Sequence, residues 1–138
     1  DYSELNRYRI TRQGSRVAIL ALGSFYGLGE AVVAKLQSET GVNATLINPR
    51  YITGLDVDML ESLKKEHQVV VTLEDGVLDG GFGEKIARYY GDTSMRVLNF
   101  GLRKEFVDRY VASELMQANR LTDSQIIADI LASLNKLA

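Results

Sequence analysis

Apolar residues in this chain fall into short runs that alternate with amphipathic stretches. Val69–Leu73 (VVVTL) is mostly β-branched and lacks apolar/polar alternation, so it predicts a strand buried on both faces of a parallel sheet. Tyr8–Thr11 and Arg16–Leu22 predict two more strands, and the polar, glycine-containing connection between them favours a local hairpin. Val42–Asn48 and Arg96–Phe100 complete the predicted strands.

Apolar positions at helical spacing lie between and after these strands. Asp56 predicts the N-cap of one helix, and Gly41 predicts the C-terminal end of another. The last helix is the clearest, because Thr122 and Gln125 form a predicted capping box. The predicted inward faces are Val32, Val33 and Leu36; Met59, Leu60 and Leu63; Ile86, Ala87 and Tyr90; and Ile126, Ile127, Ile130, Leu131 and Leu134, with short helices at Glu105–Tyr110 and Ser113–Ala118.

The alternation of strands and helices predicts a three-layer α/β/α fold, with a mainly parallel sheet and right-handed crossovers. A flavodoxin-like domain has the same alternation and stays an open alternative. The chain has 138 residues, which suits one domain over residues 1–138 with a full hydrophobic core. It begins with Asp1 rather than methionine, which fits a processed chain or a fragment of a longer enzyme.

Composition narrows the function classes. The net charge of -2 provides no basic surface for nucleic acid, and no apolar segment is long enough to span a bilayer. The chain contains no cysteine, so disulfides and thiolate metal sites are excluded. With no signal-like start, a cytoplasmic location is expected.

The carboxyl end of the predicted central strand is the candidate site. Open α/β sheets meet ligands and partners there, and the glycines after Asp75 allow close backbone approach. Adjacent residues of a strand point to opposite faces, so Glu74 and Asp75 are not expected to act as a catalytic carboxylate pair. We predict an interdomain or dimer contact made by Glu74, Asp75, Gly76, Leu78, Gly80, Gly81, Phe82 and Gly83, with no catalytic, cofactor-binding or metal-binding residue in the chain.

Two other features favour structural roles. The glycines of Gly23–Gly29 follow a strand and precede a helix, but their spacing fits neither a dinucleotide fingerprint nor a P-loop. His67 is the only histidine and has no nucleophile at a recognisable spacing, so a surface or packing role is expected.

Four segments together resemble the C-terminal domain of the transketolase family, and within it most closely the 1-deoxy-D-xylulose-5-phosphate synthases. Val17–Ser24 is similar to the strand motif VAILxxG(T/S), and Ile47–Asp56 (INPRYITGLD) to DxRFxKPLD. Val71–Gly83 (VTLEDGVLDGGFG) is similar to VTxEEGxxxGGxG, and Val97–Phe106 (VLNFGLRKEF) to the synthase segment VxxxGLPDxF. Their order and spacing carry the resemblance over nearly the whole chain.

The resemblance implies a five-stranded mixed sheet whose N-terminal strand runs antiparallel beside the strand around Thr45, in place of the local hairpin. It implies a homodimeric parent enzyme whose two preceding domains hold thiamine diphosphate and Mg²⁺. By the same resemblance, this domain binds neither the cofactor nor the ion. The parent would join pyruvate and glyceraldehyde 3-phosphate into 1-deoxy-D-xylulose 5-phosphate and CO2, for isoprenoid and thiamine precursor synthesis. The isolated domain would be inactive.

Two alternatives stay open at this point. The first is the same domain from a transketolase or from a 2-oxoacid dehydrogenase β subunit. The second is a free-standing regulatory or nucleotide-binding α/β module.

Overall fold

A computed structural model describes residues 7–50, 54–103 and 112–136. Its strands are β1 (Arg9–Arg12), β2 (Arg16–Ala21), β3 (Thr45–Asn48), β4 (His67–Val77) and β5 (Arg96–Leu102). Its helices are the short 3-10 helix η2 (Gly23–Phe25), α1 (Tyr26–Thr40), α2 (Val57–Leu63), α3 (Phe82–Tyr89), α4 (Ala112–Ala118) and α5 (Asp123–Asn135). The predicted helix at Glu105–Tyr110 lies outside the described residues.

The five strands form one mixed sheet in the order β1-β3-β2-β4-β5. β2 is parallel to both β3 and β4, and β5 is parallel to β4. β1 alone is antiparallel, with Arg9 opposite Asn48. This confirms the mixed sheet implied by the resemblance, in which one antiparallel edge strand is added to four parallel strands.

The local hairpin prediction is wrong, because β3 lies between β1 and β2. The connection between β1 and β2 crosses the start of β3, where the Gly14 amide donates to Thr45 Oγ1 at 2.9 Å and the Ser15 amide to the Asn43 carbonyl at 2.8 Å. β2 therefore pairs with the parallel strands β3 and β4 at its two edges, and all its side chains after Arg16 are buried.

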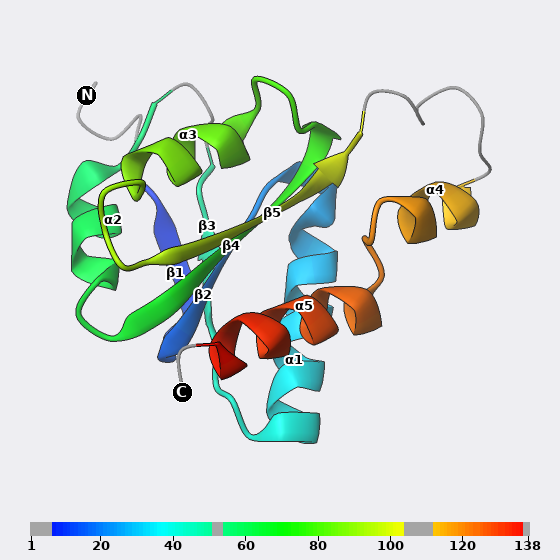
Figure 1. The fold of residues 1–138 in the computed structure, drawn as a ribbon, viewed down its shortest axis with the longest axis horizontal. Coiled ribbons are helices and arrows are strands. Elements are labelled where there is room, and N and C mark those ends of the chain that lie inside the picture. Colours follow the sequence, from blue (N-terminus) through cyan, green and yellow to red (C-terminus); the bar gives the residue numbers. More distant parts are fainter. Residues whose placement is uncertain (1–6, 51–53, 104–111, 137–138) are drawn as a thin grey trace.

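Two apolar cores cover the two faces of the sheet. Figure 1 shows α2 and α3 on one side of the sheet and α1 and α5 on the other. Along β4, Val69, Val71 and Leu73 pack against the α1 and α5 side, whereas Val70 packs against the α2 and α3 side. This division confirms the prediction of a central strand buried on both faces.

The predicted helix ends are confirmed. Gly41 has φ of 77° and its amide donates to the Gln37 carbonyl at the end of α1. Asp56 accepts from the Met59 amide at 3.2 Å at the start of α2. Thr122 and Gln125 form the predicted capping box of α5. In the described part of the chain, every helix is too short or too polar to cross a membrane.

Candidate functional site

The candidate site lies at the carboxyl edge of the sheet, where β4 continues past the end of β2. β4 runs to Val77, four residues beyond the predicted end at Leu73. Its pairing with β5 is irregular between Leu73 and Val77 and resumes where Val77 lies opposite Leu102. Glu74 and Asp75 therefore belong to an extended but irregular segment, not to a free loop.

Glu74 caps the N-terminus of α3. Its carboxylate accepts from the Phe82 amide at 3.2 Å and from the Gly83 amide at 2.7 Å. Gly81 at the N-cap position has no side chain to accept these N–H groups, so a strand carboxylate takes over the capping role. Burial of Glu74, which is 5% exposed, raises its pKa, while the two amide donors oppose that shift.

Asp75 holds the turn that follows β2. Its Oδ2 accepts from the Ser24 amide at 3.0 Å and from the Ser24 hydroxyl at 2.9 Å. These bonds lower the pKa of Asp75, so the carboxylate is ionised at neutral pH. Gly23 has φ of 57°, and a Cβ there would lie 2.5 Å from Asp75 Oδ2, so this turn requires glycine.

The two carboxylates therefore point to opposite sides of the sheet. Glu74 serves the first turn of α3, and Asp75 serves the turn that leads into α1. In this geometry the two carboxylates do not converge on a common point. Sequence reasoning missed Ser24 as the partner of Asp75, because only the fold brings the ends of β2 and β4 side by side.

The glycines of the segment have different roles. Gly80 has φ of 70°, and Gly76 is exposed with open space around its Cα. A Cβ on Gly83 would lie 2.7 Å from Thr72 Oγ1 and from Asn99, so α3 approaches the sheet closely at this residue. Gly81 has φ of -84°, so the positive φ of this segment is at Gly80 and not at the N-cap residue of α3.

The predicted contact residues divide into an inner and an outer set. Phe82 is 3% exposed and meets the Tyr8 ring edge-on at 6.1 Å between ring centroids. The inner set, buried within the domain, is Glu74, Phe82 and Gly83. The outer set, exposed or half-buried, is Asp75, Gly76, Leu78, Gly80 and Gly81, together with the exposed Asp79, which was not among the predicted contact residues.

His67 has the expected packing role. Its Nδ1 donates to the Leu63 carbonyl at 3.0 Å, and its Nε2 lies 2.7 Å from Thr45 Oγ1. In the neutral ring the proton is on Nδ1, so Nε2 accepts the hydroxyl proton of Thr45, whose oxygen accepts the Gly14 amide. Burial lowers the pKa of His67, which keeps the ring neutral at pH 7.

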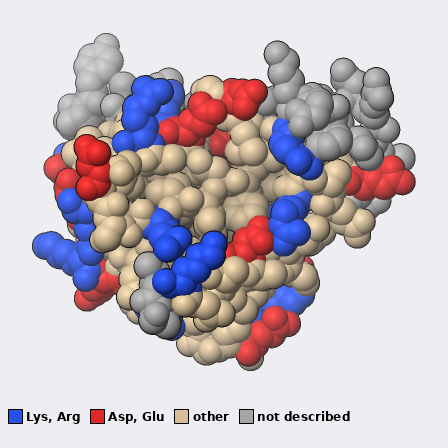
Figure 2. All heavy atoms as spheres, viewed as in Figure 1, with Lys and Arg blue, Asp and Glu red and all other residues tan. Residues whose placement is uncertain are grey.

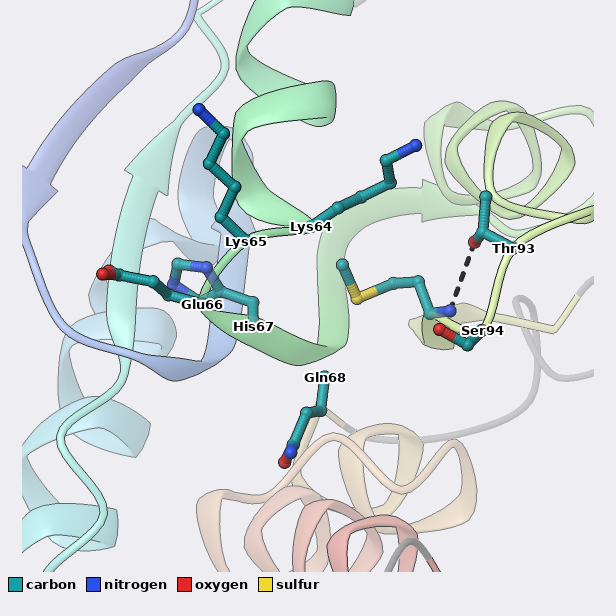
Figure 3. A pocket seen from close by; sticks show the side chains of 8 residues that line it. Lys64, Lys65, Glu66, His67, Gln68, Thr93 and Ser94 are labelled. Atoms are coloured by element: carbon teal, nitrogen blue, oxygen red, sulfur yellow. Dashed lines mark hydrogen bonds between the residues drawn. The ribbon is translucent and has the colours of Figure 1, made fainter.

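A hollow of about 440 Å³ lies at the opposite, amino edge of the sheet. Residues 64–68, between α2 and β4, and Thr93, Ser94 and Met95 before β5 line it. Figure 3 shows the Lys64 and Lys65 side chains extending away from one another, and Lys64 pairs with Glu61 at 2.7 Å. The two ammonium groups do not converge on a ligand, so the carboxyl edge remains the candidate site.

Comparisons with known proteins agree on one family. Residues 6–126 match the family described as the C-terminal domain of transketolase. The chain is 33% identical over 132 residues to 1-deoxy-D-xylulose-5-phosphate synthase of Shouchella clausii, covering 94% of this chain and 21% of that protein. It is 34% identical over 134 residues to the synthase of Gloeothece citriformis, covering 96% of this chain and 21% of that protein. The chain thus spans about a fifth of the length of the curated relatives it matches.

Solved structures share the fold. An inactive β4 tetramer of a split-gene transketolase matches with a TM-score of 0.84 and 22% identity, over 96% of this chain and 43% of that one. A transketolase from Pichia stipitis matches with a TM-score of 0.61 and 14% identity, over 97% of this chain and 19% of that one.

Proposed function

Because the chain belongs to the transketolase C-terminal domain family, we propose that it is the C-terminal domain of a 1-deoxy-D-xylulose-5-phosphate synthase. The observation that carries the proposal is the match to curated synthases at 30% to 34% identity along most of this chain. These relatives favour the synthase over a transketolase, a 2-oxoacid dehydrogenase β subunit or a free-standing module. The parent enzyme would use thiamine diphosphate to join pyruvate and glyceraldehyde 3-phosphate, and a cytoplasmic location belongs to the same proposal.

The described residues do not fit thiamine diphosphate or its magnesium ion. Within residues 7–50, 54–103 and 112–136, no three His, Cys, Asp or Glu side chains are grouped so that they could hold a metal ion. Glu74 and Asp75 lie at the expected edge, but amide N–H groups already engage both carboxylates. We therefore assign cofactor binding to other domains of the parent and assign no reaction step to this chain.

We propose that the outer set at the carboxyl edge docks on a neighbouring domain or on a second subunit. The two carboxylates fix the segment to the starts of α1 and α3, so its surface is preorganised for contact. Leu78 supplies a half-buried apolar side chain, and Gly76 and Gly80 leave backbone exposed beside it. Phe82 supports this surface from within the core and does not face a partner.

The test uses the full-length parent with Leu78→Asp and the control Val57→Asp, since Val57 is 49% exposed at the start of α2. Leu78→Asp should weaken the dimerisation affinity, measured by analytical ultracentrifugation, by roughly tenfold, which corresponds to about 1.4 kcal/mol. If the surface contacts a neighbouring domain instead, synthase activity should fall by roughly the same factor. The melting temperature of the 138-residue chain should stay nearly unchanged in both variants. If Leu78→Asp destabilises the 138-residue chain by as much as it weakens the full-length parent, Leu78 is only a core residue and the docking proposal fails.

The parent assignment has its own test. The coding sequence upstream of residue 1 should contain a Gly-Asp-Gly diphosphate motif and a pyrimidine-domain glutamate in the same reading frame. A reading frame without them would contradict the assignment, whatever the outcome at Leu78.

A further inference from the structure

The two edges of the sheet are built differently. β1 has four exposed residues, two of them arginines, and its pairing is irregular between Ile10 and Arg12. Short length, charge and irregularity are the devices by which proteins prevent an edge strand from pairing further. β5 at the other edge has seven residues, all apolar or uncharged after Arg96. In the part of the chain that the structure describes, its outer side has no strand partner.

A hollow of about 360 Å³ follows this open edge. Five consecutive β5 residues, Val97–Gly101, line it together with Leu78, Asn119 and Asp129. Successive side chains of a strand alternate between the two faces, so a hollow that meets all five follows the backbone edge. Figure 1 shows β5 in front, between α3 and α5, and Figure 2 shows an uncharged hollow on the same face with charged residues around it.

Arginines flank the strand at both ends. Arg96 begins β5, and its buried Nε has no hydrogen-bond partner among the described residues. Arg103 follows β5 with an exposed side chain that also donates to the Ala118 carbonyl. Arg120 lines the hollow but is paired with Asp129 through two bonds of 2.9 and 2.8 Å. The residues along this groove thus carry an excess of positive charge.

We propose that the β5 edge binds an extended peptide segment of another chain, which adds a sixth strand and carries acidic side chains near its ends. Main-chain hydrogen bonds would supply affinity, and the flanking arginines would select for acid. Leu78 lines this hollow and also belongs to the outer set, but the proposal is argued from the β5 edge and its flanking arginines and does not rest on the proposed function. A second copy is disfavoured, because antiparallel β5 pairing centred on Asn99 would place Arg96 of one copy opposite Leu102 of the other, one residue away from Arg103.

The probe is the blocked heptapeptide Glu-Thr-Val-Thr-Val-Thr-Glu, titrated into the 15N-labelled chain and followed by NMR. Amide shifts should change along Arg96–Leu102. A lysine-ended control peptide should bind roughly tenfold more weakly, the effect of two exposed charge pairs. A version methylated on alternate amides, which cannot complete the ladder, should not bind.

Two variants test the charge selection. Arg96→Gln and Arg103→Gln should each bring the acidic peptide's affinity closer to that of the lysine-ended peptide. Arg9→Gln, on the exposed β1 edge, is the matched control and should change neither affinity. Arg103 is exposed, so its variant stays informative if Arg96→Gln lowers the melting temperature.

Three outcomes would overturn the proposal. The first is no shift on β5 at millimolar acidic peptide, and the second is equal binding of the methylated peptide. The third is a concentration-dependent dimer in sedimentation with protected β5 amides, which would assign the edge to a second copy.

Discussion

Replacing Glu74 by Gln should lower the free energy of unfolding by about 1–3 kcal/mol at neutral pH, the cost of one buried donor left without an acceptor. The carboxylate accepts the Phe82 amide through Oε1 and the Gly83 amide through Oε2. A glutamine offers one acceptor oxygen, and its NH₂ group would face the other amide. Removal of the desolvated charge offsets part of this cost, which places the value in that range rather than above it.

The pH dependence of the same variant gives a second, independent readout. Burial raises the pKa of Glu74 in the folded chain above its ordinary value of 4.5. The folded state then binds more protons than the unfolded state, so this residue's contribution to stability is complete below about pH 4.5 and declines as pH rises through the folded pKa. Glutamine does not titrate and lacks this pH-dependent contribution. The difference in unfolding free energy between the unsubstituted chain and the variant should therefore be widest at low pH.

Urea denaturation of the 138-residue chain between about pH 4 and pH 8 measures both effects. Glu84→Gln is the matched control, because Glu84 is also in the first turn of α3 and accepts the Gly80 amide at 3.0 Å, but is exposed. Its cost should stay below about 0.5 kcal/mol. If Glu74→Gln costs no more than this control, the capping argument fails. A gap that does not change with pH would instead contradict the raised pKa of Glu74.

Three further outcomes are expected. Gly83→Ala should destabilise the chain by about 1–3 kcal/mol in urea titrations, since its Cβ would meet Asn99 at 2.7 Å, whereas Gly76→Ala, in open space, should be near neutral. The lowered pKa of His67 means that the unfolded state binds more protons, so its contribution to stability should be lost as pH falls below about 6.5, a dependence absent in His67→Gln. Thiamine diphosphate with Mg²⁺ should not bind the isolated chain more tightly than roughly 10 μM in calorimetry, about 7 kcal/mol.

Local patterns predicted the elements well where one stretch of sequence carries all the determinants. The capping box at Thr122 and the glycine at Gly41 each fix a helix end through bonds within a few residues. The uninterrupted apolar run of β4 likewise predicts burial on both faces, whichever strands lie beside it. These predictions were confirmed because the features depend on residues close together in the sequence and not on contacts with distant segments.

Sequence patterns failed where the partner is distant in the chain. A short polar connection favours a hairpin locally, but β3 enters between β1 and β2, and only the family resemblance indicated this. The apolar Phe82 reads as a contact residue in a glycine-rich loop, yet it packs on Tyr8 from the other end of the chain. Neither outcome is encoded in the hydrophobic period of the segment itself.

The alternation of side chains along a strand explains how one dipeptide organises the candidate site. Because Glu74 and Asp75 are consecutive in β4, one carboxylate is directed to the α3 side and the other to the α1 side. Each carboxylate accepts amide N–H groups at the start of a helical segment, where such groups lack partners within the helix. A single strand end therefore anchors both helical layers at the same edge, and the segment that follows, from Gly76 to Gly80, lies between Asp75 and the N-cap residue Gly81 of α3. For this reason, we expect changes at the buried Glu74 to act on docking through the shape of the surface, whereas changes at Leu78 act through contact itself and changes at the exposed Asp75 act through both.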